Sequence, residues 1–312
     1  MKEVRAFAPA SVTNVGCGFD VLGFAIEKPG DEVVVRLRNS KGITIKKISG
    51  DGGKLSKDIE QNTAGVAVRA FLNEISFEKG IEIEIYKNMA LGTGLGSSAA
   101  SAVAAVVALD HLLNTKLTKR ELLKFALEGE KLTSGGRYHA DNVAAALYGG
   151  LVVIRCSDDL DVINIDYPDD LNCAIIYPHI VMNTSDMRRL LRKEITLADA
   201  VKQWSNIASL VTGFMKKDYT IISKSINDFI VEPVRSLLIP SFYEMKKAAI
   251  DAGAVGCSIS GSGPSLFALT KSKAAANKTA NEMKKVLDKI EIECDIYISG
   301  INRKGPKILS AK

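Results

Sequence analysis

The sequence predicts an α+β protein with two domains, and three observations support this prediction. The chain has 312 residues, and at roughly 150 residues per domain this length favours two domains. Short β-branched or alternating runs predict strands, and longer segments with apolar residues at helical spacing predict helices. These strands and helices interleave without a regular strand–helix rhythm, which favours α+β over a doubly wound parallel sheet.

The first half of the chain predicts a sheet with helices between its strands. Residues 81–85 alternate between Ile and Glu, as the residues of a half-buried strand do. Thr118 is followed three residues later by Glu121, which is the pattern of a capping box at the start of a helix. The predicted strands are residues 33–37, 43–45, 81–85 and 150–155, and the predicted helices are residues 63–75, residues 98–113 and a segment that begins at Thr118.

The second half of the chain begins after a polar, acidic stretch at residues 157–161. We therefore predict one domain at residues 1–156 and a second at residues 157–312. In the second domain the predicted strands are residues 173–177, 257–269 and 292–298, and the predicted helices are residues 196–215, 240–251 and 273–289.

The composition is that of a folded protein and excludes several functional classes. Apolar residues make up 46 % and charged residues 25 %, which excludes a disordered or fibrous chain. The net charge of +5 is too small to argue for nucleic-acid binding. The five cysteines are far apart and form no Cys-x-x-Cys pair, so neither a disulfide framework nor a zinc site is indicated. Because no signal-like or membrane-spanning apolar run occurs, we expect a soluble, cytoplasmic protein without membrane contact.

The glycine-rich segment 92–98 is the sharpest chemical feature of the sequence. Gly92, Gly94 and Gly96 alternate with other residues, and Ser97 and Ser98 follow at the start of a predicted helix. Glycines let backbone N–H groups converge on an anion, and the helix adds unpartnered N–H groups and the positive end of its dipole. The segment therefore predicts a phosphate-binding loop. A flexible turn before a core helix is the plainer alternative, which the order of glycines, serines and small residues disfavours.

Two familiar nucleotide-binding patterns do not match this loop. A Walker loop requires Lys-Ser or Lys-Thr after its last glycine, whereas Ser97 and Ser98 occupy these positions. A dinucleotide fingerprint requires Gly-x-Gly-x-x-Gly, whereas the three glycines here are each two residues apart.

Two further segments combine glycines with polar residues. Residues 258–265 form a second glycine cluster that could let another backbone pass closely or donate N–H groups to the same anion. In residues 8–20, the Asn14 side chain can donate and accept hydrogen bonds, and Asp20 can hold a cationic amine or a metal. A structural turn is about as good an interpretation of each segment taken alone.

The remaining candidates are isolated charged side chains. Glu130 could complete a Mg²⁺ site with a loop serine. Asp141 could orient or deprotonate a nucleophile with His139 beside it, although an Asp-Asn pair is often only a helix N-cap. Arg188 and Arg235 could each grip a carboxylate bidentately, although exposed arginines are usually only solvated.

Taken together, these segments resemble the motifs of a known enzyme family. APASVTNVGCGFDVLG (8–23), LGTGLGSSAAS (91–101) and SISGSGPS (258–265) stand in the order and roughly the spacing of the three motifs of the GHMP kinases. The segments HADN (139–142) and EPVR (232–235) are similar to those of the homoserine kinases within that superfamily. The resemblance covers nearly the whole chain.

The resemblance implies a fold and an activity. It implies an N-terminal domain of ribosomal-protein-S5-like fold and a C-terminal ferredoxin-like domain, with the active site between them. It also implies ATP-dependent phosphorylation of the L-homoserine hydroxyl to O-phospho-L-homoserine, a step in threonine biosynthesis, with ATP as co-substrate and Mg²⁺ as the metal. Dimers are common among such enzymes, so the sequence leaves a homodimer open.

The resemblance also implies a role for each site residue. Asn14 would contact the substrate hydroxyl, Asp20 and Asp141 its ammonium, and Arg188 and Arg235 its carboxylate, with Thr184 and His139 nearby. Asn14 and Asp141 are the catalytic candidates, and Ser98 (or Ser97) and Glu130 would hold Mg²⁺. Arg189 directly follows Arg188, so which of the two faces the substrate stays open. The residues implied to bind ATP are Asn62, Lys87, Leu91, Gly92, Thr93, Gly94, Leu95, Gly96, Ser97, Ser98, Ala99, Gly261, Ser262 and Gly263.

Two rival functions remain at this point. Another small-alcohol GHMP kinase, such as a mevalonate-type enzyme, would share the phosphate loop, but its substrate has a carboxylate and no amine. A non-catalytic ATP-binding sensor would keep the fold, but the presence of Ser98, Glu130 and Asp141 speaks against it.

Overall fold

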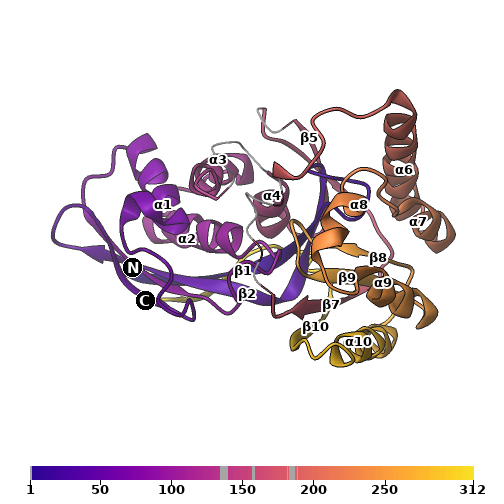
Figure 1. Cartoon of the computed structure of the whole chain (residues 1–312). Coiled ribbons are helices and arrows are strands. Elements are labelled where there is room, and N and C mark those ends of the chain that lie inside the picture. Colours follow the sequence, from indigo (N-terminus) through magenta and orange to yellow (C-terminus); the bar gives the residue numbers. More distant parts are fainter. Residues whose placement is uncertain (1, 134–139, 157–158, 181, 183–186, 188) are drawn as a thin grey trace.

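A computed structural model describes residues 2–133, 140–156, 159–180, 182, 187 and 189–312. In this part of the chain the strands form two sheets, and each sheet carries helices on one of its faces (Figure 1). The N- and C-terminal ends lie side by side, because the backbone N–H of Lys2 donates to the carbonyl of Lys312 (Figure 1).

The larger sheet has seven strands in the described residues, and all neighbouring pairs are antiparallel except β3 and β4. Its main path runs β11-β1-β2-β4-β3, and β5 pairs with the start of β2 and with β6. Each predicted strand of this half corresponds to an observed strand, although Gly150 lies outside β5, and β1, β6 and β11 were not predicted. The strands are β1 (Glu3–Thr13), β2 (Leu22–Arg38), β3 (Ile43–Ser49), β4 (Gly80–Tyr86), β5 (Leu151–Cys156), β6 (Asp161–Ile165) and β11 (Lys307–Ala311).

Four helices cover one face of this sheet: α1 (Thr63–Glu74), α2 (Ser97–Leu113), α3 (Lys119–Glu130) and α4 (Ala140–Tyr148) (Figure 1). The capping box at Thr118 is present with both of its hydrogen bonds, as predicted. Twelve of the seventeen residues of α2 are buried, so this helix is the centre of the core rather than an amphipathic surface helix.

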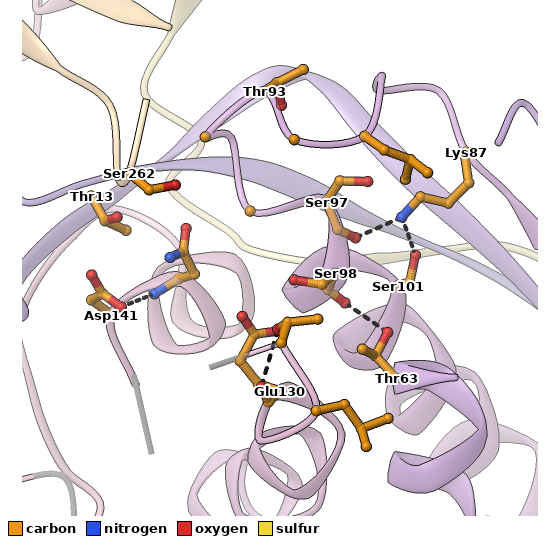
Figure 2. A pocket seen from close by; sticks show the side chains of 18 of the residues that line it. Thr13, Thr63, Lys87, Thr93, Ser97, Ser98, Ser101, Glu130, Asp141 and Ser262 are labelled. Carbon is orange, nitrogen blue, oxygen red and sulfur yellow. Dashed lines mark hydrogen bonds between the residues drawn. The ribbon is translucent and has the colours of Figure 1, made fainter. Parts of the chain in front are cut away.

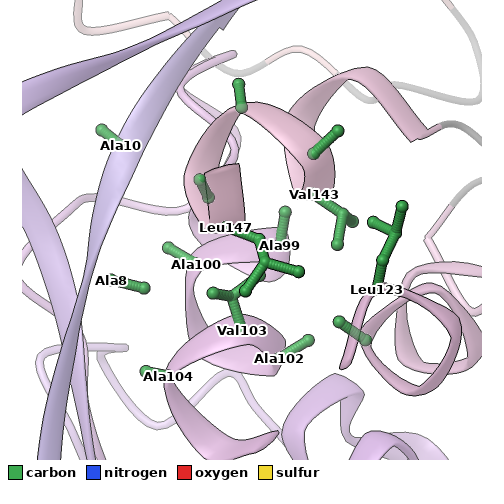
Figure 3. Close-up of a cluster of buried hydrophobic side chains, with 14 of the residues drawn as sticks. Ala8, Ala10, Ala99, Ala100, Ala102, Val103, Ala104, Leu123, Val143 and Leu147 are labelled. Carbon is green, nitrogen blue, oxygen red and sulfur yellow. The ribbon is translucent and has the colours of Figure 1, made fainter. Parts of the chain in front are cut away.

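Small side chains allow α2 to lie close to the sheet. Alanine is the best helix former, and it leaves room for a neighbouring strand. Figure 3 shows Ala100 and Ala104 of α2 on the side of Ala8 and Ala10 of β1, whereas Ala102 points the other way, toward Leu123 of α3. The Ala-rich sequence therefore fixes the position of α2, whose first turn belongs to the phosphate-loop segment.

The smaller sheet has four antiparallel strands in the order β10-β7-β9-β8. With the helices α9 and α10 against one face, this βαββαβ order is the ferredoxin-like arrangement that the resemblance implied. The strands are β7 (Asn172–Pro178), β8 (Gly256–Ile259), β9 (Leu266–Thr270) and β10 (Cys294–Gly300), and the helices are α9 (Phe242–Asp251) and α10 (Lys273–Asp288).

One predicted element of this sheet is wrong. Residues 257–269 were predicted as one strand, but they form two strands joined by a loop. Gly261 and Gly263 within it have φ angles of 56° and 84°. Extended backbone has negative φ, so these glycines end β8 and turn the chain back into β9.

The remaining helical elements lie outside these two sets of helices. They are α6 (Leu197–Met215), α7 (Tyr219–Ser225), α8 (Glu232–Arg235) and the 3₁₀ turns at Ile59–Gln61 and Ser236–Leu238. Among the described residues, none of the helices has the length and apolar character needed to cross a membrane. The predicted domain boundary falls in the connection between β5 and β6 and stays a prediction.

Candidate active site

A cavity of about 740 Å³ opens between the two sheets. Its walls come from the end of β1, the segment 87–98, the ends of α3 and α4, and the loop between β8 and β9 (Figure 2). Most of the predicted site residues line it. They are Asn14, Asp20, Asn62, Lys87, Leu91, Gly92, Thr93, Gly94, Gly96, Ser97, Ser98, Glu130, Asp141, Arg235, Gly261 and Ser262.

Six predicted site residues are not among the residues that line the cavity. Leu95 and Ala99 are fully buried in the core, and Gly263 lies behind the cavity wall against the phosphate loop. His139, Thr184 and Arg188 lie outside the described residues. Arg189, which the sequence left as an alternative to Arg188, is exposed and lines the cavity.

The phosphate-loop segment has the backbone that an anion site requires. Gly92, Gly94 and Gly96 have φ angles of 75°, 77° and 67°. Gly96 is also the N-cap of α2 and provides no side chain to cap it. The first N–H groups of α2 therefore begin at the cavity wall with the positive end of the helix dipole, which favours an anionic ligand.

The second glycine cluster packs directly against this loop. The Ser260 hydroxyl donates to the Gly94 carbonyl at 2.8 Å, and the Ser265 N–H donates to the Thr93 carbonyl at 3.3 Å. A Cβ on Gly94 would lie 2.4 Å from the Ser260 carbonyl oxygen. Close backbone approach, one of the two roles considered for residues 258–265, is therefore observed, and it joins the two sheets beside the cavity.

Lys87 lies at the cavity wall with its charge buried and paired. Its ammonium contacts the Asp31 carboxylate and also donates to the Ser97 carbonyl at 2.8 Å and the Ser101 hydroxyl at 2.7 Å (Figure 2). The Lys87 and Asp31 side chains are 2 % and 0 % exposed. Burial lowers the pKa of Lys87, and the Asp31 carboxylate opposes this effect.

Another part of the cavity wall, beside the loop at 260–263, combines a cation with two polar loop residues. The Arg235 guanidinium is buried, donates to the Gly261 carbonyl at 2.8 Å and lies 5.2 Å from the centre of the Phe19 ring. The Asn14 amide donates to the same carbonyl at 2.7 Å and accepts the Asp20 N–H at 3.1 Å. These contacts hold Asn14, Asp20 and Arg235 around one end of the cavity.

Asp141 lies in the first turn of α4 and is 3 % exposed. One of its carboxylate oxygens accepts the N–H of Asn142 at 2.9 Å. The Asn142 side chain accepts the Ser11 hydroxyl at 2.8 Å, and this pair lies against Gly96, where a Cβ would be 2.2 Å from the Ser11 oxygen. The start of α4 is therefore fixed against the phosphate loop.

Ser98 and Glu130 offer a hydroxyl and a carboxylate to the same side of the cavity (Figure 2). Within the described ranges, no three His, Cys, Asp or Glu side chains gather as a metal site would require. Mg²⁺, however, keeps several waters and takes only one or two protein oxygens beside those of a phosphate. The donor set present here therefore fits a Mg²⁺–nucleotide complex and does not fit a metal held by the protein alone.

Sequence reasoning missed several residues of the site. Asp31 joins Lys87, Ser97 and Ser101, but it follows Pro29-Gly30 and looks like a turn residue in the sequence. In the sequence Asp31 is a carboxylate two residues before the predicted strand at 33–37, which by itself does not indicate these contacts. The residues that line the cavity and were not predicted, apart from Arg189, are Thr13, Phe19, Leu55, Gln61, Thr63, Ile85, Ser101, Leu132, Thr133 and Asn142.

Two family models match the chain, and both matched ranges contain residues that line this cavity. "GHMP kinases N terminal domain" matches residues 62–150, and "GHMP kinases C terminal" matches residues 210–289. The first range contains the phosphate loop, Glu130 and Asp141, and the second contains Arg235 and the loop at 260–263.

Individual proteins are similar over the full length. A homoserine kinase of Chloroherpeton thalassium is 47 % identical over 99 % of this chain and 100 % of its own. The crystal structure of homoserine kinase from Cytophaga hutchinsonii is 52 % identical, covers 99 % of this chain and 98 % of its own, and has a TM-score of 0.96. The structure of L. major mevalonate kinase, at 16 % identity over 96 % of this chain and 95 % of its own with a TM-score of 0.72, shares the fold. The predicted two-domain α+β fold is confirmed, and the chain belongs to the homoserine kinase family of the GHMP kinases.

Proposed function

We propose that this chain transfers the γ-phosphoryl group of ATP to the side-chain hydroxyl of L-homoserine and forms O-phospho-L-homoserine, a step of threonine biosynthesis. One observation carries the proposal. The cavity joins an anion-binding half, at residues 92–98, to a half that offers carboxylates and a guanidinium, from Asp20, Asp141 and Arg235. A nucleotide triphosphate suits the first half and a zwitterionic amino acid suits the second.

The roles of the substrate-binding residues follow from their chemistry. Arg235 pairs with the substrate carboxylate, because a guanidinium grips a carboxylate bidentately. Asp20 and Asp141 hold the ammonium. Asn14 uses one N–H for Gly261, and its second N–H, which makes no hydrogen bond among the described residues, is available to the reacting oxygen.

The nucleotide half works by position and charge. The N–H groups of residues 92–98 and the start of α2 hold the phosphates, and Asn62 lies near the base. Phosphoryl transfer passes through a loose transition state, so the alignment of the hydroxyl with the γ-phosphate and neutralisation of charge supply most of the acceleration. Ser98 and Glu130 would hold Mg²⁺, which when bound neutralises charge on the phosphate oxygens.

The carboxylates favour this substrate over that of a mevalonate-type kinase. Mevalonate carries a carboxylate but no amine, so it offers no ammonium group to the carboxylates of Asp20 and Asp141. A non-catalytic nucleotide sensor is the other alternative. It would bind ATP and turn over no alcohol.

A coupled ADP-release assay with L-homoserine, mevalonate, shikimate and galactose tests the proposal. Turnover with L-homoserine at least a hundredfold above the other alcohols is expected. Preference for mevalonate would reject the substrate, and ATP binding without turnover of any alcohol would favour the sensor. Phosphorus NMR of the product identifies the phosphorylated oxygen.

Three further predictions belong to the same proposal and concern the location of the enzyme, its assembly and its domain boundary. The enzyme acts in the cytoplasm, and its assembly is open between a monomer and a homodimer. Its two domains meet between residues 156 and 157. Sedimentation at several concentrations tests the dimer, and expression of residues 1–156 alone tests the boundary.

A further inference from the structure

The Asp31 carboxylate, which does not line the cavity, organises three side chains that do. It contacts the Lys87 ammonium and accepts hydrogen bonds from the hydroxyls of Ser97 at 2.8 Å and Ser101 at 3.1 Å. Its other oxygen accepts the N–H of Asn88 at 2.9 Å. A fully buried carboxylate is stable only when such partners surround it. The partners of Asp31 are therefore needed to keep its charge in the core.

The same network leaves Lys87 no proton for a ligand. An ammonium has three N–H donors. One of those of Lys87 is used by Asp31. The other two are used by the Ser97 carbonyl and the Ser101 hydroxyl (Figure 2). The Ser97 hydroxyl likewise has a single proton, which it donates to Asp31. Neither side chain can donate a hydrogen bond to a phosphate without breaking this network.

We propose that Asp31 is a positioning residue for the phosphate loop, and that Lys87 acts as its buried counter-ion rather than as a phosphate ligand. The pair ties the end of β4 and the first turn of α2 to β2. It thereby fixes the backbone N–H groups of residues 92–98 and the Ser98 hydroxyl toward the nucleotide. This inference rests on the proposed placement of ATP in that loop.

Asp31→Asn separates this proposal from a direct contact between Lys87 and phosphate. If Asp31 positions the loop, the KM for ATP rises by about tenfold or more while the KM for L-homoserine changes less than about threefold. If Lys87 is a phosphate ligand, loss of its buried partner frees the ammonium, and ATP binding stays the same or becomes tighter. The second result would overturn the proposal.

If Asp31→Asn does not fold, the double variant Asp31→Asn/Lys87→Met still allows ATP binding to be measured without the Asp31 carboxylate. Removing both partners of a buried ion pair is far less costly than removing one, because no unpaired charge remains. The double variant is therefore expected to fold and to bind ATP more tightly than Asp31→Asn. ATP binding about a hundredfold weaker than in the unchanged protein, from a folded double variant, would contradict the positioning role.

Two controls complete the experiment. Glu84→Gln removes another buried carboxylate that pairs with an arginine, but Glu84 does not line the cavity. It is expected to lower stability and leave the KM for ATP unchanged, so a rise in this KM would show that destabilisation alone explains the Asp31 result. The unchanged protein, assayed with ATP and L-homoserine, tests the proposed function separately, because its inactivity would reject that function whatever the variants do.

Discussion

The side chains of Asn14 and Arg235 donate hydrogen bonds to one acceptor, the carbonyl oxygen of Gly261, at 2.7 and 2.8 Å. Asn14 follows β1 of the larger sheet, and Arg235 ends α8. Gly261 belongs to the loop that packs against Gly94 of the phosphate loop. The two side chains that we propose to bind the substrate are therefore positioned by the same loop that packs against the phosphate loop.

The first prediction concerns Arg235. Arg235→Leu should raise the KM for L-homoserine strongly, because loss of a buried ionic contact costs on the order of 2–5 kcal/mol. The KM for ATP should change by less than about threefold. Arg235→Lys should recover part of the loss, since it keeps the charge but not the bidentate geometry. Steady-state kinetics with each substrate varied in turn provide the measurement.

Arg192 supplies the control for this prediction. It is exposed and is not among the residues that line the cavity. Arg192→Leu should leave both KM values unchanged. An unaltered KM for L-homoserine in Arg235→Leu would remove Arg235 from the substrate site.

The second prediction assigns Asp141 to binding. The carboxylate lies in the first turn of α4, and one of its oxygens accepts the N–H of Asn142 at 2.9 Å. In the proposed function this carboxylate pairs with the substrate ammonium, because the two groups carry opposite charges. Asp141→Asn should therefore raise the KM for L-homoserine by about tenfold or more and lower kcat by less than about tenfold. A kcat reduced about a thousandfold with an unchanged KM would instead identify Asp141 as the base.

The fold was largely predictable because its strands and helices carry clear local patterns. The alternation at 81–85 and the capping box at Thr118 each correspond to an observed element. β1 was not predicted, because Pro9 and Ser11 interrupt its apolar residues with types that are typical of turns. Its pairing with β2, including a bulge between Pro9 and Ser11, overrides that local preference.

The site was predictable where function needs an unusual local sequence. Three alternating glycines before two serines have no common structural explanation, so residues 92–98 stood out. Asp31 did not, because its importance depends on contacts with residues 56 to 70 positions away in the chain. Such long-range contacts have no signature in a single sequence.

The third prediction tests the contact between the two glycine loops. Gly94→Ala should raise the KM for ATP by at least about tenfold, because a Cβ would lie 2.4 Å from the Ser260 carbonyl oxygen and would displace the phosphate loop. Gly53→Ala is the matched control. Gly53 has a φ of 75°, close to the 77° of Gly94, but a Cβ there meets no atom within 4 Å. The control should cost about 1 kcal/mol of stability and leave the KM unchanged. Equal KM values for the two variants would contradict the steric argument.

The fourth prediction concerns acid stability and involves the sheet rather than the cavity. Glu84 on β4 contacts Arg36 on β2 at 2.7 Å and is almost buried, with 9 % of its side chain exposed. The hydrogen bond from Arg36 lowers the pKa of Glu84 below its ordinary value of 4.5. Because the folded-state pKa lies below the unfolded-state value, the stabilisation is present above about pH 4.5 and is lost as pH falls through the folded-state pKa.

Urea unfolding at pH 7 and at pH 3 measures this effect. The unchanged protein should lose more stability between the two pH values than Glu84→Gln does, by about 1–2 kcal/mol, because the variant has no charge to lose. Glu78→Gln is the control, since Glu78 and its partner Lys41 are both 80 % exposed and solvent screens such a pair. Its pH dependence should match that of the unchanged protein. If Glu84→Gln also matches, the Arg36–Glu84 pair does not contribute to acid sensitivity, and the loss at low pH must come from other carboxylates.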